Sequence, residues 1–169
     1  MEPKDKLANK LAEALRTIDF DTRYYGFYQK IRQSNKSTDS ALKKADWERA
    51  LAATGERFHY DAREKFFASE GKAAGACSIA LHVLFRNDRT TFTFAVRAPH
   101  GVTGGPFSVL AEKVGLLRDP QFKPDPPYPT LPFANPDQLL EVARFGVDIY
   151  KDAVRALSSC ALCNDKSNP

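Results

Sequence analysis

Residues 76–97 read ACSIALHVLFRNDRTTFTFAVR, and they contain two runs in which apolar side chains recur at every second position. A period of two is typical of β-strands, and the short polar loop Asn87-Asp88-Arg89 between the runs is typical of a β-hairpin. The apolar face of this hairpin consists of Cys77, Ile79, Leu81, Val83, Phe85, Phe92, Phe94 and Val96. The other face is mixed, so the sequence predicts an antiparallel sheet with one covered face and one face that can remain open.

Three amphipathic helices are predicted before the hairpin, because apolar residues recur there at helical spacing. Their apolar stripes are Leu7, Leu11, Leu15 and Ile18, then Tyr24, Phe27, Tyr28 and Ile31, then Leu42, Ala45, Trp47 and Leu51. The first helix covers residues 4–18, Asp19 or Asp21 can cap the second, and Gly55 can end the third.

Three segments around the hairpin have weaker patterns. Residues 56–69 fit either a strand or a helix, and we favour a strand because a further strand would stabilise the hairpin. Residues 70–75 are rich in glycine and alanine, so we expect a flexible joint there. Residues 99–105 contain three glycines and a proline, which predicts a loop.

Two helices are predicted after the hairpin. The first begins at Pro106, whose missing N–H suits a first helical position, and it can end at Gly115. The segment 120–136 then holds seven prolines and is expected to run extended over the surface, because proline cannot pair within a central strand.

The last helix has the clearest start in the chain. Asn135 is a good N-cap, Pro136 occupies the first helical position, and Gln138 completes a pattern similar to a capping box. The following apolar face is wide and continues to Leu157, so we expect this helix to lie across the sheet.

These elements predict a single α+β domain over residues 1–169. Its expected parts are a helical N-terminal part (1–55), a meander of about three antiparallel strands (56–98), a loop and two helices that back the sheet (99–159), and a flexible tail (160–169).

Composition and charge are ordinary for a globular protein. The chain has 169 residues and a net charge of +4, with lysine and arginine scattered among acidic residues instead of forming a basic stripe. No apolar run approaches the length that spans a bilayer, and the N-terminus does not resemble a secretory signal. With three cysteines and no disulfide pattern, we expect a cytoplasmic protein.

No motif in the chain predicts catalysis. Cys160 and Cys163 form a CxxC pair without the further ligands that zinc requires. The glycine-rich segment 100–106 lacks the Lys-Ser/Thr of a phosphate-binding loop. His59, His82 and His100 have no nucleophile or carboxylate at a diagnostic spacing. We therefore expect no catalytic residue, no cofactor and no metal.

Aromatic residues gather at 24–28 and suggest either a stacking platform or core packing. Tyr24, Phe27 and Tyr28 share one face of the predicted helix, which favours the core. Tyr25 lies off that face and is expected to be the most exposed of the group.

The second half of the chain resembles small bacterial immunity proteins of toxin–immunity systems. The resemblance lies in the layout of the hairpin, the segment Gly104-Gly105-Pro106-Phe107, the proline-rich stretch from Tyr128 to Phe133, and the closing helix over 139–150. It implies a domain without catalysis that binds and blocks a cognate toxin. The net charge of +4 favours an acidic or neutral toxin over a basic nuclease.

Partner binding is predicted on the open face of the sheet, by steric occlusion, with arginine and tyrosine as anchors. The predicted partner-binding residues are His82, Arg86, Thr91, Thr93, Arg97 and Tyr128. One alternative is a small-molecule binder or enzyme with a pocket between the sheet and the aromatic helix over 24–31. A weaker alternative is a nucleic-acid-associated regulator, which requires the basic residues to gather on one face.

The substitution Arg97→Glu is expected to weaken partner binding without unfolding the domain, because it reverses one charge at the edge of the predicted interface. Titration calorimetry with the isolated partner measures this loss. Unchanged affinity would remove Arg97 from the interface.

Overall fold

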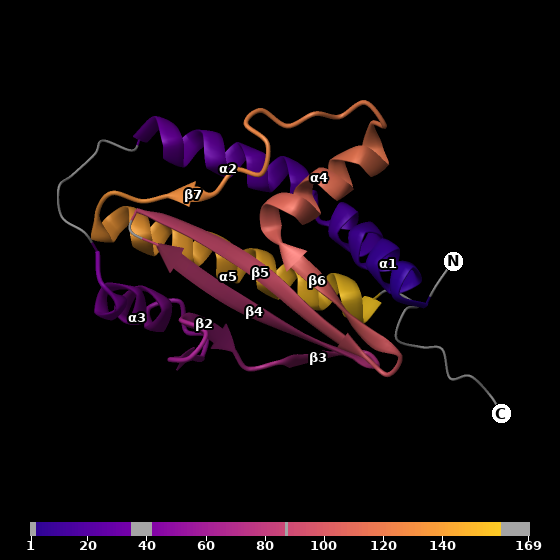
Figure 1. The fold of residues 1–169 in the computed structure, drawn as a ribbon, viewed down its shortest axis with the longest axis horizontal. Coiled ribbons are helices and arrows are strands. Elements are labelled where there is room, and N and C mark those ends of the chain that lie inside the picture. The colour runs from indigo at the N-terminus through magenta and orange to yellow at the C-terminus, as the bar shows by residue number, and fades with distance from the viewer. Residues whose placement is uncertain (1–2, 35–41, 87, 160–169) are drawn as a thin grey trace.

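The computed structural model describes residues 3–34, 42–86 and 88–159 (Figure 1). In chain order the elements are α1 (Pro3–Thr17), α2 (Phe20–Ser34), α3 (Lys44–Ala52), β1 (Phe58–Asp61), β2 (Phe66–Ser69), β3 (Lys72–Ala74), β4 (Cys77–Arg86), β5 (Arg89–Ala98), β6 (Gly101–Pro106), α4 (Phe107–Arg118), β7 (Leu131–Pro132) and α5 (Pro136–Ser159). The chain is thus an α+β protein with three helices, an antiparallel sheet and two further helices. Its sheet has more strands than the three expected. The prediction missed the additional strands because they are very short.

The long strands β4 and β5 form the predicted hairpin and the centre of the sheet. Their register places Ile79 opposite Val96, and Leu81 opposite Phe94, so the apolar side chains of both strands share one face. The four side chains named here are at most 1% exposed. The alternation seen in the sequence is therefore the alternation between a buried and an open face.

Short strands pair in tandem along both sides of the hairpin. On one side β2 and β3 both pair with β4, and β1 extends the sheet beyond β2. On the other side β6 and β7 both pair with β5. The sheet is therefore widened by pieces of two to six residues, which are too short to give a clear period in the sequence.

Side chains close the gap between β2 and β3. The amide of Leu81 donates a hydrogen bond to the Ser69 hydroxyl at 2.8 Å, and the Tyr150 hydroxyl lies 3.0 Å from the carbonyl oxygen of Ile79. The same hydroxyl lies 3.1 Å from the carbonyl oxygen of Glu70. Since a buried backbone group without a partner is costly, these side chains allow the ladder to be interrupted here.

The described helices pack on the buried face of the sheet, and together they form one core cluster with it. Figure 1 shows that α5 runs along the β4–β5 hairpin. The helices α1, α2 and α4 lie together beside it. Phe107 of α4 contacts Phe92 and Phe94, with ring centroids 5.4 and 4.5 Å apart. Trp47 of α3 stacks on Phe85 at 5.8 Å.

The start of α5 follows the expected capping pattern with one change of partner. The Gln138 amide N–H donates to the Asn135 side chain at 2.9 Å, as predicted. The Gln138 side chain accepts from the amide of Ala134 instead of Asn135, and its own amide donates to the carbonyl oxygen of Ser34 in α2. This buried side chain therefore ties the first turn of α5 to the end of α2.

Three local predictions differ from the structure: the strand favoured at 56–69 is present but divided, and the assignments of residues 70–75 and Gly115 were wrong. Residues 56–69 form two strands instead of one, since the Asp61 carboxylate accepts hydrogen bonds from the amides of Arg63 and Glu64 and so closes a turn. Residues 70–75 contain β3 and are not simply a flexible joint. Gly115 does not end α4, which continues to Arg118.

The predicted loop at 99–105 is largely strand β6, and glycine explains why it pairs so closely. A Cβ atom on Gly104 would lie 2.0 Å from the carbonyl oxygen of Phe94, and the backbone there has a φ of +137°. Only glycine fits this conformation and this contact. The glycines therefore serve strand pairing and not a phosphate-binding turn.

Two helical glycines make a matched test of core packing. A Cβ atom on Gly146 of α5 would lie 2.4 Å from the Phe92 ring, whereas one on Gly26 of α2 meets nothing within 4 Å. We expect Gly146→Ala to lower the free energy of unfolding by about 1–3 kcal/mol through overpacking. Gly26→Ala should raise it by about 0.5–1 kcal/mol because alanine favours the helix. Urea denaturation followed by circular dichroism measures both, and equal effects would contradict this packing.

Candidate functional site

The face of the sheet turned away from the helices is covered by no element of the described residues. We call it the open face. It includes His59, Asp61, Phe66, Ala68, Ala73, Ser78, Ala80, His82, Leu84, Arg86, Arg89, Thr91, Thr93, Ala95, Arg97, Val102, Gly104 and Pro106. In a sheet that is packed on both faces, the side chains of both faces are buried. Here only one face packs against the core, so the uncovered face is a candidate binding surface.

The middle of the open face is flat and partly apolar. Ala80 lies opposite Ala95, and Gly104 of β6 continues this row, so few atoms stand above the strands there. Next to this row, the rings of Phe66 and His82 stack with their centroids 4.6 Å apart. Leu84 lies opposite Phe66 in the ladder and is 38% exposed.

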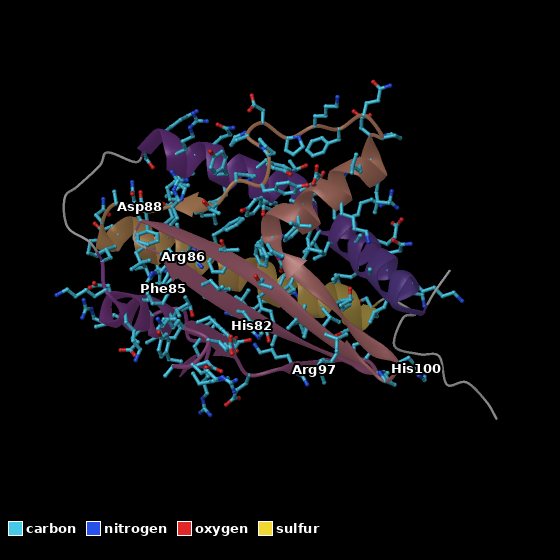
Figure 2. The ribbon with its side chains drawn as sticks, in the orientation of Figure 1. His82, Phe85, Arg86, Asp88, Arg97 and His100 are labelled. Atoms are coloured by element: carbon cyan, nitrogen blue, oxygen red, sulfur yellow. The ribbon has the colours of Figure 1, made fainter. Side chains whose placement is uncertain are left out.

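The two ends of the open face are basic. Arg86 and Arg89 face each other across the hairpin turn, and Arg97 lies at the far end of β5 (Figure 2). Arg89 contacts the Thr130 hydroxyl at 3.4 Å and lies 3.9 Å from the Asp88 carboxylate. Arg86 and Arg97 are exposed and form no ion pair with any residue that the structure describes.

His82 is the titratable group nearest to the middle of the open face. Burial lowers its pKa, because the charged imidazolium loses hydration beside Phe66. The nearby His59 and Arg97 lower the pKa further, since both disfavour a second positive charge. His82 is therefore held towards its neutral form.

Five of the six predicted partner-binding residues share this surface. His82, Arg86, Thr91, Thr93 and Arg97 all direct their side chains to the open face. Their grouping follows directly from the strand period.

Tyr128 lies elsewhere, on the helical side of the molecule. It is 53% exposed, and a hydrogen bond to Glu112 of α4 raises its pKa. The proline segment passes over α2 and α4, where the Tyr24 hydroxyl donates a hydrogen bond to the carbonyl oxygen of Pro129. The expected rim of the open face therefore forms without Tyr128.

Sequence reasoning missed Phe66 and Leu84 as members of the site. Leu84 has the same parity as His82, which was a usable signal. Phe66 has the same parity in the sequence as Phe58 and Tyr60, but the turn at 62–65 places it opposite Asp61, on the other face of the sheet. Detecting that turn from the Asp61 side chain would have placed Phe66 correctly.

Aromatic side chains occupy the space where a pocket was considered, between the sheet and the helix over 24–31. Phe20 of α2 contacts Phe94 and Phe107 with ring centroids 6.2 and 5.1 Å apart. Tyr24 and Tyr28 are buried, as expected for core residues. Tyr25 is half-buried and so more exposed than Tyr24 and Tyr28, as expected. Its ring nevertheless packs on Phe122 at 5.5 Å, and burial is the main cause that raises its pKa to about 12.

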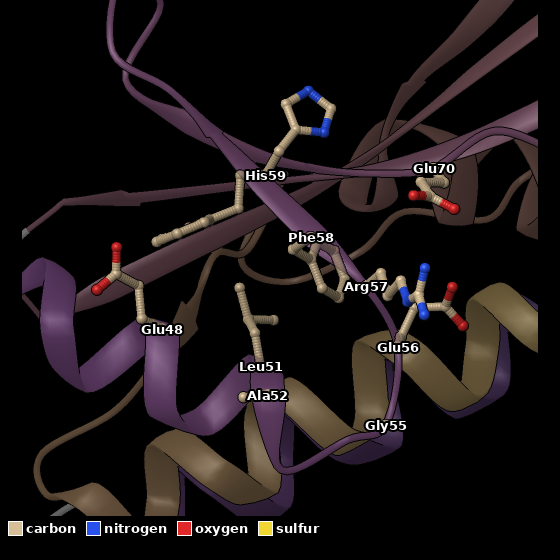
Figure 3. A pocket seen from close by; sticks show the side chains of 10 residues that line it. Glu48, Leu51, Ala52, Gly55, Glu56, Arg57, Phe58, His59 and Glu70 are labelled. Carbon is tan, nitrogen blue, oxygen red and sulfur yellow. The ribbon is translucent and has the colours of Figure 1, made fainter.

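A groove of about 520 Å³ opens between the end of α3 and strand β1 (Figure 3). Leu51, Ala52, Phe58 and Phe67 give it an apolar floor. The carboxylates at its rim are largely compensated, since Glu48 pairs with Lys44 at 3.1 Å and Glu56 pairs with Lys72 at 2.6 Å. His59 points away from the groove, so no acid–base pair converges in it.

The other candidate motifs stay apart. His100 lies at the turn between β5 and β6, at the opposite end of the hairpin from Arg86. Within the described ranges, no three His, Cys, Asp or Glu residues are placed to hold a metal ion. Cys160 and Cys163 lie outside the described residues.

Comparisons with protein-family models, curated proteins and solved structures find no match to this chain. None of the helices in the described part of the chain has the length and apolar character needed to cross a membrane.

The lowered pKa of His82 predicts a loss of stability in mild acid. The unfolded chain has the higher pKa, so it takes up the proton first as the pH falls below about 6.5. The stability associated with neutral His82 is therefore complete above that pH and is lost as the pH falls towards the folded-state pKa. Urea denaturation across about pH 7 to 5 should show a smaller loss for His82→Gln than for the wild type.

A matched pair of variants tests the cause of this shift. Arg97→Gln should raise the pKa of His82, measured by NMR titration of the imidazole, because it removes a repelling charge. Arg86→Gln also removes one positive charge, but at the hairpin end of β4, opposite to the end where Arg97 lies. This variant should leave the pKa of His82 as in the wild type. Equal values in both variants would contradict the role of Arg97.

Proposed function

We propose that this chain is a non-catalytic cytoplasmic protein that binds a protein partner on the open face. The observation that carries the proposal is that no described element covers this face, although the opposite face is fully packed. The specific form that we favour is an immunity protein, which neutralises a cognate toxin by occluding its active surface. This specific form is supported by the sequence resemblance.

The side chains of the open face have the composition of a protein interface. Phe66, His82 and Leu84 form a partly apolar centre, and Arg86 and Arg97 stand at its edges. Protein interfaces typically join an apolar core to a polar rim, and arginine and aromatic side chains are enriched there. A flat centre of small residues also allows close approach of a second surface.

A small-molecule site remains the second candidate, and the groove between α3 and β1 is the observation that favours it. Its volume lies within the usual range of ligand sites, roughly 300–1,000 Å³. The groove offers an apolar floor but no converging catalytic groups, so it supports binding more than chemistry.

Placing a bulky side chain in the middle of the open face tests the main proposal. We expect Ala95→Trp to abolish capture of the partner from a lysate of the native host, because the indole would hold a flat partner away from the strands. Quantitative mass spectrometry of the bound proteins, with the tagged full chain as bait, measures the loss. If the partner is a toxin, its expression without this chain is expected to arrest growth. Co-expression of the wild-type chain is then expected to relieve that arrest.

Asp148→Trp is the matched control, since Asp148 is exposed on α5 on the other side of the sheet. It should leave capture unchanged, and circular dichroism should show that both variants are folded. A protein that is captured equally by the wild type and Ala95→Trp would contradict binding on the open face. Failure of any protein to bind would contradict the proposal as a whole.

A further inference from the structure

Positive charge on the open face is confined to its two ends. Arg86 and Arg89 stand beside the hairpin turn, and Arg97 stands at the opposite end. Between them lie alanine, serine, threonine, histidine and leucine side chains, none of which carries a negative charge. On β4 and β5 the open face is therefore basic at both ends and neutral in the middle.

Two of these arginines, Arg86 and Arg97, are available to a partner. Arg86 and Arg97 are exposed without an ion pair in the described part of the chain, whereas most arginines on the helical side are paired. Among those, Arg23 pairs with Asp152 at 2.8 Å and Arg118 pairs with Asp19 at 2.6 Å. Arg86 and Arg97 can therefore pair with the acidic groups of a partner, whereas Arg89 already lies 3.9 Å from the Asp88 carboxylate.

The distance between the two ends suits a folded partner. Arg89 and Arg97 are eight positions apart along β5, which corresponds to about 26 Å at the usual rise of a strand. One side of a standard protein interface covers roughly 800 Å², a patch of similar width. A single partner surface can therefore reach both basic ends at once.

We propose that the partner is an acidic protein, whose carboxylates pair with Arg97 at one end and with Arg86 and Arg89 at the other. This inference rests on the proposed function and specifies the chemistry of the partner. Arginine forms bidentate hydrogen bonds with carboxylates, which fixes the register of the two surfaces. The neutral centre then contacts a neutral part of the partner.

A nucleic acid fits this pattern less well. Binding of a single strand uses a continuous basic groove together with successive aromatic platforms. On the open face the basic groups are interrupted by the neutral centre, and Phe66 with His82 is the one stacked ring pair that the described residues place there. An acidic protein surface needs neither feature.

The test uses the isotope-labelled full chain and poly-L-glutamate as an acidic polypeptide probe, followed by NMR. We expect the probe to shift amide signals of β4 and β5 and their arginine side chains. The double variant Arg86→Gln/Arg97→Gln should bind the probe about tenfold more weakly, since two charge contacts are lost. The matched double variant Lys6→Gln/Lys10→Gln removes the same charge from exposed positions of α1 and should bind like the wild type.

Three outcomes would overturn the inference. The probe could shift only signals of the helical side, both double variants could lose affinity equally, or a thymidine oligonucleotide could occupy the open face in preference to the probe.

The captured partner provides a separate check. If Ala95→Trp abolishes capture and Arg86→Gln/Arg97→Gln leaves it unchanged, the open face binds a protein but the acidic partner is excluded. If Ala95→Trp leaves capture unchanged, the proposed function itself fails.

Discussion

Pairing of β4 with β5 is the constraint on which the rest of the structure depends. The register places all the large apolar side chains of the two strands except Leu84 on the same face, so that face needs a covering layer. The described helices converge on it, and α5 contributes Tyr150, which also completes the interrupted ladder beside β4. A sheet packed on one side leaves its other side for binding, and the candidate site is therefore a direct result of the same alternation.

The sequence was informative wherever one period continued over many residues. The hairpin and the helices α1, α2, α3 and α5 were predicted near their observed bounds, because each repeats its apolar pattern several times. The short strands β3, β6 and β7 were missed, and β1 and β2 were predicted as one strand, since two to six residues do not define a period. The glycines of β6 were also misleading, because Gly104 is required for close strand pairing and not for a loop.

For the candidate site, the faces of side chains were likewise predicted correctly within the long hairpin and incorrectly outside it. Residues on β4 and β5 were grouped correctly, since parity alone places His82 and Arg97 on one face. Tyr128 and Phe66 were misplaced, because their positions depend on how a proline-rich segment crosses the helices and on a turn stabilised by Asp61. Odd or even position in the sequence predicts which side chains of one hairpin share a face. Which side chains of separate segments come together depends instead on tertiary packing.

The small side chains in the middle of the open face have a thermodynamic consequence for recognition. Alanine and glycine have no side-chain rotamers to lose, and serine and threonine have few, so ordering this region on binding costs little conformational entropy. The longest side chains of β4 and β5 on this face, which have the most rotamers, are Arg86, Arg89 and Arg97 at the ends. The row of small side chains therefore loses little side-chain entropy on binding, and more of the entropic cost of association falls on the arginines that select the partner.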